Sequence, residues 1–264
     1  MPSIAAPDGD IYYEQRGDGP RLLFLNGSGA TLVTSAPLID VFAGAFDLVA
    51  YDQRGLGRSA AVTRPYAMAD LAADCAVVLD AVGWTTCRVV GVSFGGMVAQ
   101  ELAVTEPGRI ERLALLCTSA GGAGGSSYPL HDLASLSPSE RAERMPALLD
   151  GRFSPEWLAN HPVDRAIAEM AADRARAPRT DEQRAGEQTQ LAARRHHDVW
   201  DRLGAVRCPT FVGCGRHDPI APVANGEAIA SRLADVEVHV YDGGHIFWAQ
   251  DRAALPEVIG FLRS

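Results

Sequence analysis

Short apolar runs, which are typical of buried strands, alternate along the chain with longer segments in which apolar residues recur at helical spacing. Helical spacing is found over residues 68–82 and 94–102, in segments long enough to cross over between parallel strands. Together they predict an α/β fold with a mostly parallel, doubly wound sheet that is covered on both faces. The predicted strands are Leu22 to Leu25, Leu48 to Tyr51, Val89 to Val92, Leu113 to Cys117, Phe211 to Val212 and Val236 to Tyr241.

This alternation stops after Cys117, where four glycines between residues 121 and 125 form a flexible junction. The next seventy or so residues carry helix-start signals but no strand pattern, and the strand pattern resumes near residues 206–210. We therefore expect a core made of residues 1–125 and 200–264, with residues 126–199 inserted as a helical cap, or lid, that selects substrates. The three helix starts are marked by Ser137-Pro138, Ser154-Pro155 and Thr180-Asp181.

Composition narrows the class of protein. With 264 residues, 47% of them apolar, the chain is long enough for one large α/β domain. The net charge of −9 disfavours nucleic acid and anionic membrane as partners. The arginine-rich stretch 174–195 is interleaved with acidic residues, so we interpret it as a solvated helix surface. Because the N-terminus lacks a signal peptide and no apolar run is long enough to span a membrane, we expect a cytoplasmic protein.

Neither a disulfide framework nor a metal site is expected. The five cysteines are an odd number and form no CxxC pair, and Cys87 and Cys117 lie beside predicted strands, which suggests buried thiols. His196-His197-Asp198 has no third cluster of suitable spacing, so we interpret it as a solvated helix end.

The segment Gly91-Val92-Ser93-Phe94-Gly95 matches the pattern G-x-S-x-G, which is weak evidence in a chain with 26 glycines. Its context strengthens it, because a predicted strand precedes Ser93 and a predicted helix follows. A serine on such a sharp turn has a strained backbone and an exposed hydroxyl, and the helix N-terminus favours the negative charge that develops in acyl transfer. We therefore predict that Ser93 is a nucleophile.

A serine hydroxyl needs a base, and the base needs an orienting acid. His245 follows the last predicted strand in a glycine-rich loop, at the carboxyl edge where open α/β sheets bind ligands. Asp218 follows another predicted strand and should emerge at the same edge. Asp242 and His217 lie in the same two loops, and we favour Asp218 over Asp242 as the acid.

The order Ser93, Asp218, His245 resembles the nucleophile, acid, base order of the α/β-hydrolase family, and the resemblance covers the whole chain. Residues 51–59, YDQRGLGRS, are similar to the family's D-x-R-G-x-G-x-S loop, in which Asp52 and Arg54 brace the loop. Residues 91–100, GVSFGGMVAQ, resemble serine esterase and enol-lactonase members. The resemblance implies a serine rather than an aspartate nucleophile, and an oxyanion hole formed by the main-chain N–H groups of Ser28 and Phe94.

One departure from the family concerns the loop after the first predicted strand. Many relatives have His-Gly there, whereas this chain has Asn26-Gly27. Asn26 either holds the loop as the histidine would or contacts the substrate. Trp157 and Phe247 are further candidates for lining the substrate cleft, although such aromatic residues are core residues at least as often.

These features predict a serine hydrolase that cleaves a small carboxylic ester or lactone through an acyl-enzyme, with no cofactor. The same three residues could instead serve carbon–carbon bond hydrolysis, cofactor-free perhydrolysis or an aminopeptidase activity. A more distant alternative is a non-catalytic ligand-binding scaffold, because a fold alone does not determine function. Assembly as a homodimer stays open.

Overall fold

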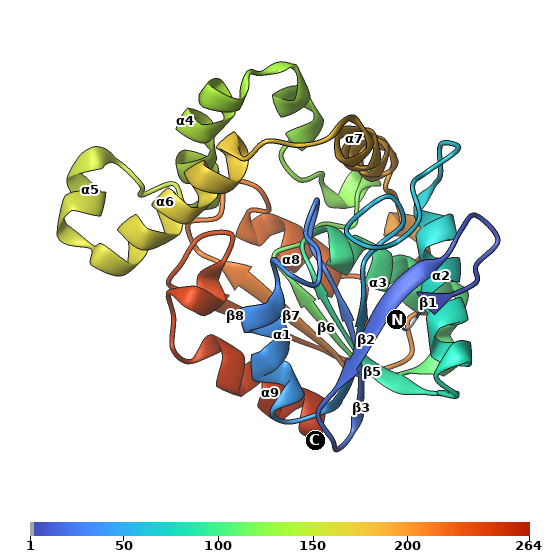
Figure 1. Ribbon diagram of the computed structural model, residues 1–264. Coiled ribbons are helices and arrows are strands. Elements are labelled where there is room, and N and C mark those ends of the chain that lie inside the picture. The colour runs from blue at the N-terminus through green and yellow to red at the C-terminus, as the bar shows by residue number, and fades with distance from the viewer. Residues whose placement is uncertain (1–2) are drawn as a thin grey trace.

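The computed structural model describes residues 3–264, which form one eight-stranded sheet with helices on both faces (Figure 1). Each of the six predicted strands overlaps an observed strand. The strands are β1 (Ser3–Ile4), β2 (Ile11–Arg16), β3 (Arg21–Leu25), β4 (Asp47–Tyr51), β5 (Cys87–Val92), β6 (Ile110–Leu116), β7 (Thr210–Gly215) and β8 (Val236–Tyr241).

The strand order is β1-β2-β4-β3-β5-β6-β7-β8. Every pair from β4 through β3 to β8 is parallel, and only β1 and β2 run antiparallel to their neighbours. The predicted mostly parallel, doubly wound sheet is therefore confirmed. The sequence analysis missed β1 and β2, which lie at one edge of the sheet and are only partly buried, so they lack the continuous apolar run of a central strand.

The two predicted crossover helices are observed as α2 and α3. The α-helices are α1 (Ala36–Ala43), α2 (Met68–Ala81), α3 (Phe94–Thr105), α4 (Pro138–Leu149), α5 (Pro155–Asn160), α6 (Pro162–Arg176), α7 (Asp181–Arg195), α8 (Val223–Ala230) and α9 (Ala254–Arg263). Short 3-10 turns are η1 (Pro107–Arg109), η2 (Gly122–Gly124), η3 (Leu130–Ser135), η4 (Trp200–Ala205) and η5 (Phe247–Ala249).

The sheet separates two apolar cores. Along β3, Leu23 and Leu25 belong to the core on one face, while Leu22 and Phe24 belong to the core on the other. Helices α2, α3 and α8 cover the first face, and α1 and α9 cover the second (Figure 1). Because successive side chains of a strand point to opposite faces, a strand buried on both sides must be apolar at every position, which explains the runs seen in the sequence.

Along the chain, helices α4 to α7 come between β6 and β7, within the predicted cap. Of these helices, α5 projects furthest from the sheet (Figure 1). The two ends of this insertion meet, because Gly121 pairs with Asp198 and the Val199 N–H donates to the Ala120 carbonyl at 2.9 Å. The predicted helix starts are confirmed. The side chains of Ser137, Ser154 and Thr180 cap α4, α5 and α7. The exact limits 126–199 stay a prediction.

Helix α6 was not predicted. It begins at Pro162 after His161, whose side chain makes no capping hydrogen bond, so the usual start signal is missing. In the arginine-rich stretch, which covers the end of α6 and α7, every arginine except Arg194 is exposed or half-buried, as predicted. Arg194 is buried, which corrects the interpretation of the whole stretch as solvated surface.

The five cysteines are free and buried. Burial raises the pKa of Cys75 and of Cys87 to about 12, so both thiols stay protonated and behave as small core residues. Among residues 3–264, no helix is both long and apolar enough to cross a membrane. The same residues contain no group of three His, Cys, Asp or Glu side chains placed to hold a metal ion.

Candidate active site

Ser93 lies on the turn between β5 and α3 in a strained backbone conformation. Its φ of 54° and ψ of −111° fall outside the regions that non-glycine residues prefer. The turn is held from both sides, because the Ser93 N–H donates to the Leu116 carbonyl at 2.8 Å and the Thr118 hydroxyl donates to the Ser93 carbonyl at 2.8 Å. Such strain persists only where the surroundings enforce it, and it is found most often at functional sites.

Two glycines allow the strand, the turn and the helix to pack this closely. A Cβ added to Gly95 would lie 2.1 Å from the Leu25 carbonyl oxygen, and one added to Gly91 would lie 2.4 Å from the Gly95 carbonyl oxygen. Any side chain at either position would force α3 away from the ends of β3 and β5. The glycines of the G-x-S-x-G pattern therefore place Ser93 beside the loop that follows β3.

His245 lies between Ser93 and Asp218. Its Nε2 is 2.9 Å from the Ser93 hydroxyl oxygen, and its Nδ1 is 2.7 Å from Asp218 Oδ2. Ser93 follows β5, Asp218 follows β7 and His245 follows β8, so parallel strands deliver all three side chains to one edge of the sheet. All three are less than one-tenth exposed. The structure thus brings together the three residues that the sequence analysis selected.

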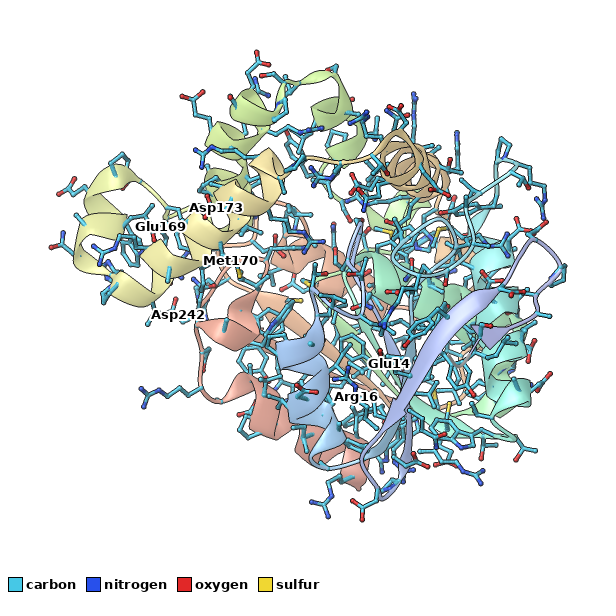
Figure 2. All side chains as sticks on the ribbon, in the orientation of Figure 1. Glu14, Arg16, Glu169, Met170, Asp173 and Asp242 are labelled. Carbon is cyan, nitrogen blue, oxygen red and sulfur yellow. The ribbon has the colours of Figure 1, made fainter. Side chains whose placement is uncertain are left out.

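Asp218 and Asp242 have different surroundings. Oδ1 of Asp218 accepts hydrogen bonds from the Ile220 N–H at 2.7 Å and the Ala221 N–H at 2.9 Å, which leaves Oδ2 for His245. Asp242 is 71% exposed and pairs with Arg152 at 2.9 Å, and Figure 2 places it near the outer edge of the molecule. Only Asp218 is therefore hydrogen-bonded to His245.

The loop after β3 lies against Ser93. A Cβ added to Gly27 would be 3.7 Å from the Ser93 Cβ, so Ser28 belongs to a backbone segment next to the hydroxyl. Phe94 is the first residue of α3, where main-chain N–H groups have no partner within the helix. The oxyanion-hole role of the Ser28 and Phe94 N–H groups stays a prediction.

Comparison with known proteins agrees with this architecture. The family described as alpha/beta hydrolase fold matches residues 20–250. The chain belongs to the α/β hydrolase family. It is 33% identical over 250 residues to RutD of Variovorax paradoxus, provisionally named a carbamate hydrolase, with 89% of each chain covered. It is 30% identical over 249 residues to a poly(3-hydroxyalkanoate) depolymerase of Ectopseudomonas oleovorans, covering 92% of this chain and 84% of the relative.

A solved structure has the same fold over its full length. The enol-lactonase from Burkholderia xenovorans LB400 superposes with a TM-score of 0.81, covers 100% of both chains and is 24% identical. At this identity the likeness shows the fold. This chain is accordingly a hydrolase-family protein with the α/β hydrolase architecture.

Buried amides connect the loop after β3 to helix α7. The side-chain amide of Gln53 donates to the Asn26 carbonyl at 3.1 Å, and that of Gln190 donates to Gln53 Oε1 at 2.6 Å. Oε1 of Gln190 accepts from the Gly29 N–H at 2.7 Å, and Gln190 is fully buried. The sequence analysis missed both glutamines. Gln53 lies inside the D-x-R-G motif, but Gln190 has no local signal.

Two further contacts join the inserted helices to the site. Arg174 of α6 donates from Nη2 to the Gly29 carbonyl at 2.7 Å. The His245 N–H donates to the Leu149 carbonyl, at the end of α4, at 2.6 Å. Helices α4, α6 and α7 therefore fasten the loops that carry or flank Ser93 and His245, which a lid independent of the core would not do.

The three residues suggested for substrate binding lie apart from one another. Asn26 is buried, and neither amide atom of its side chain has a partner within residues 3–264. Phe247 is fully buried and stacks on Tyr241, with ring centroids 5.0 Å apart. Trp157, in α5, stacks on His161 just after that helix, with ring centroids 3.8 Å apart. The structure thus packs Phe247 against a core aromatic residue and Trp157 against His161.

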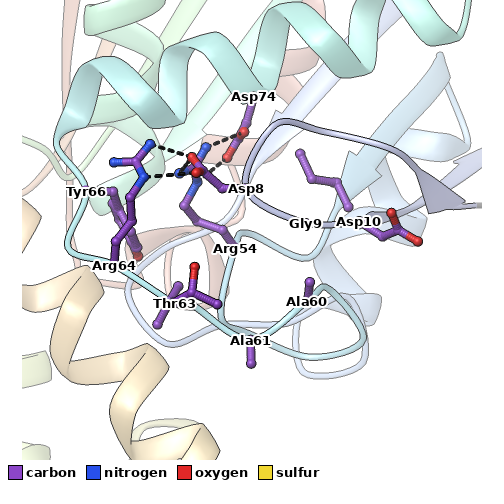
Figure 3. A pocket seen from close by; sticks show the side chains of 12 residues that line it. Asp8, Gly9, Asp10, Arg54, Ala60, Ala61, Thr63, Arg64, Tyr66 and Asp74 are labelled. Atoms are coloured by element: carbon purple, nitrogen blue, oxygen red, sulfur yellow. Dashed lines mark hydrogen bonds and ion pairs between the residues drawn. The ribbon is translucent and has the colours of Figure 1, made fainter.

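Asp52 and Arg54 brace the loop after β4, as the resemblance implies. Asp52 accepts from the Leu32 N–H at 2.7 Å and the Arg58 N–H at 3.0 Å. Arg54 donates twice to Asp74 and once to Asp8. Figure 3 shows this ion-pair cluster in a small pocket whose lining residues do not include Ser93, Asp218 or His245. Its cations are paired with carboxylates, so the pocket is a structural brace.

Proposed function

We propose that this protein is a serine hydrolase that cleaves a small carboxylic ester or lactone through an acyl-enzyme. The observation that carries the proposal is the continuous hydrogen-bonded line from Ser93 through His245 to Asp218, at 2.9 and 2.7 Å. Nucleophile and base must lie within this range for proton transfer, and the base must be held by a third group.

In the proposed reaction, the Ser93 oxygen attacks the substrate carbonyl while His245 Nε2 takes the hydroxyl proton. Asp218 keeps the Nδ1 proton of His245 in place and stabilises the imidazolium that forms. The N–H groups of Ser28 and Phe94 stabilise the oxyanion, and His245 then gives the proton to the leaving alcohol. Water, activated by the same histidine, hydrolyses the acyl-enzyme.

The two curated relatives support an acyl substrate. One is named for carbamates and the other for a polyester, and both kinds of bond present a carbonyl carbon to a nucleophile. Asn26 offers two buried polar atoms without a partner among residues 3–264, in the loop beside Ser93, so it stays a candidate for substrate contact if that loop opens. We do not extend this role to Trp157 or Phe247, because of where each side chain packs.

A fluorophosphonate probe tests the nucleophile directly. We expect it to label wild-type protein at Ser93, identified by peptide mass spectrometry, and to leave Ser93→Ala unlabelled. Turnover of short esters, lactones and carbamates by the same preparation then ranks the substrate class. A protein that folds but is neither labelled nor active on any of these substrates would contradict the proposal.

A further inference from the structure

Arg194 of α7 is a buried cation without a counter-charge. Its residue exposure is 6%, and within residues 3–264 no carboxylate forms an ion pair with it. One nitrogen, Nη1, donates to the Tyr128 carbonyl at 2.8 Å, while the buried Nε and Nη2 have no partner in the same residues. Burial lowers the pKa of Arg194 to about 10, which still leaves it charged at neutral pH.

Other arginines whose side chains are mostly buried have carboxylate partners. Arg54 pairs with Asp74 and Asp8, and Arg152 pairs with Asp150 and Asp242. A buried charge without such a partner is costly, because the protein does not replace the favourable interaction with water that the charge loses on burial. The two unpaired donors of Arg194 therefore suit an anionic ligand.

Arg194 is connected through hydrogen bonds to the loop that carries Asp218. Gln190, one helical turn earlier on α7 and about 6 Å along the axis, bonds to Gly29 beside the nucleophile. Tyr128, the acceptor of the guanidinium, donates through its own N–H to the Ile220 carbonyl at 2.8 Å, and the Ile220 N–H donates to Asp218. Helix α7 thus contacts the loop after β3 through Gln190, and the Arg194 guanidinium is linked through Tyr128 and Ile220 to the loop of Asp218.

We propose that Arg194 binds a carboxylate group carried by the substrate, so that the preferred esters or lactones are anionic. This inference rests on the proposed function and deepens it. A carboxylate offers two oxygens to the free Nε and Nη2 donors, which is the fork-to-fork arrangement that arginine favours. The substrate's own charge then replaces the carboxylate partner that the protein lacks.

The test compares esters that differ only in charge. The substrates are the 4-nitrophenyl monoesters of glutaric and pimelic acid against the same esters with the free carboxylate capped as a methyl ester. A second pair, 4-carboxyphenyl acetate against its methyl ester, places the charge on the alcohol side. We expect wild-type kcat/KM to be higher for at least one charged ester than for its neutral partner.

Variants assign that preference to one side chain. Arg194→Met should lower kcat/KM for the charged ester by about 10- to 100-fold and leave the neutral ester within a few fold, because only the charge-assisted contact is lost. Arg194→Lys should retain part of the preference. The matched control is Arg195→Met, which removes an exposed arginine from the same helix and should change neither substrate.

A second measurement needs no variant. Glutarate should slow fluorophosphonate labelling of the wild type and raise the Tm of Ser93→Ala, whereas glutaramide should do neither. The anion site alone would be overturned if the protein is labelled and hydrolyses neutral esters but neither prefers a charged ester over its neutral partner nor responds to glutarate. An equal loss on charged and neutral esters in a folded Arg194→Met would also overturn it. Failure of the labelling itself, with glutarate still binding, would instead refute the serine mechanism.

Discussion

Replacing Asp218 with Asn tests the orienting acid, and the structure predicts which way the new amide turns. Oδ1 of Asp218 accepts two main-chain N–H groups, from Ile220 and Ala221. An amide NH₂ at that position would meet two donors, so the carbonyl oxygen must stay there and the NH₂ must face His245. His245 Nδ1 then accepts a hydrogen bond instead of donating one, so the ring proton lies on Nε2 and points towards Ser93.

The magnitude follows from comparing the two orientations of the amide. The reverse orientation would leave two buried N–H groups unsatisfied at about 1–3 kcal/mol each, so the inactive tautomer dominates. Without a base, turnover depends on the oxyanion donors and binding alone, and we expect kcat to fall by about 10³- to 10⁴-fold. That loss corresponds to roughly 4–5.5 kcal/mol of transition-state stabilisation.

The assay is steady-state hydrolysis of a 4-nitrophenyl ester by Asp218→Asn and by the matched control Asp242→Asn. Asp242 is exposed and is hydrogen-bonded to Arg152 and His217 instead of His245, so its loss should leave kcat within about threefold. Thermal unfolding of both variants checks that each is folded. A folded Asp218→Asn with kcat within tenfold of wild type, or a larger loss in Asp242→Asn, would refute the reasoning.

Three further perturbations probe the same site and its support. Ser93→Ala should lower kcat by about 10³-fold or more while leaving the unfolding midpoint nearly unchanged, and near-normal turnover would exclude it as nucleophile. Gln190→Leu leaves the Gly29 N–H and the Gln53 Oε1 without a hydrogen-bond partner. Urea denaturation should therefore show that the free energy of unfolding falls by about 2–5 kcal/mol, and the exposed control Gln188→Leu should show no such loss. Equal effects of these two changes would show that the buried amide bridge contributes nothing. His197 is buried, which corrects its interpretation as part of a solvated helix end, and burial lowers its pKa to about 4, against about 6.5 unfolded. Between these two pH values the unfolded chain therefore binds more protons than the folded chain. The contribution of His197 to the free energy of unfolding is fully present above about pH 6.5, and the free energy should fall by about 3 kcal/mol as the pH approaches 4. His197→Gln should flatten this part of the pH–stability curve, and an unchanged slope would assign it to other groups.

Local features of the sequence determined the parts of the fold that depend on neighbours along the chain. Runs apolar at every position marked the central strands because both faces of the sheet are covered. Ser137, Ser154 and Thr180 marked helix starts because a cap bonds to a main-chain group only three residues away. The edge strands β1 and β2 and helix α6 were missed because partial burial and an uncapped start leave weak local patterns.

The candidate site divides in the same way. Ser93 was recognisable because its strand, turn and helix are contiguous, and His245 and Asp218 because each follows a strand of one parallel sheet. Three features became visible only in the tertiary structure. His245 is hydrogen-bonded to Asp218 and not to Asp242, and Gln190 is hydrogen-bonded to Gly29 across 161 residues of sequence separation. Arg194 is buried without a carboxylate partner among residues 3–264. Periodicity specifies which face of an element is buried, whereas the partner it meets there depends on how distant elements pack together.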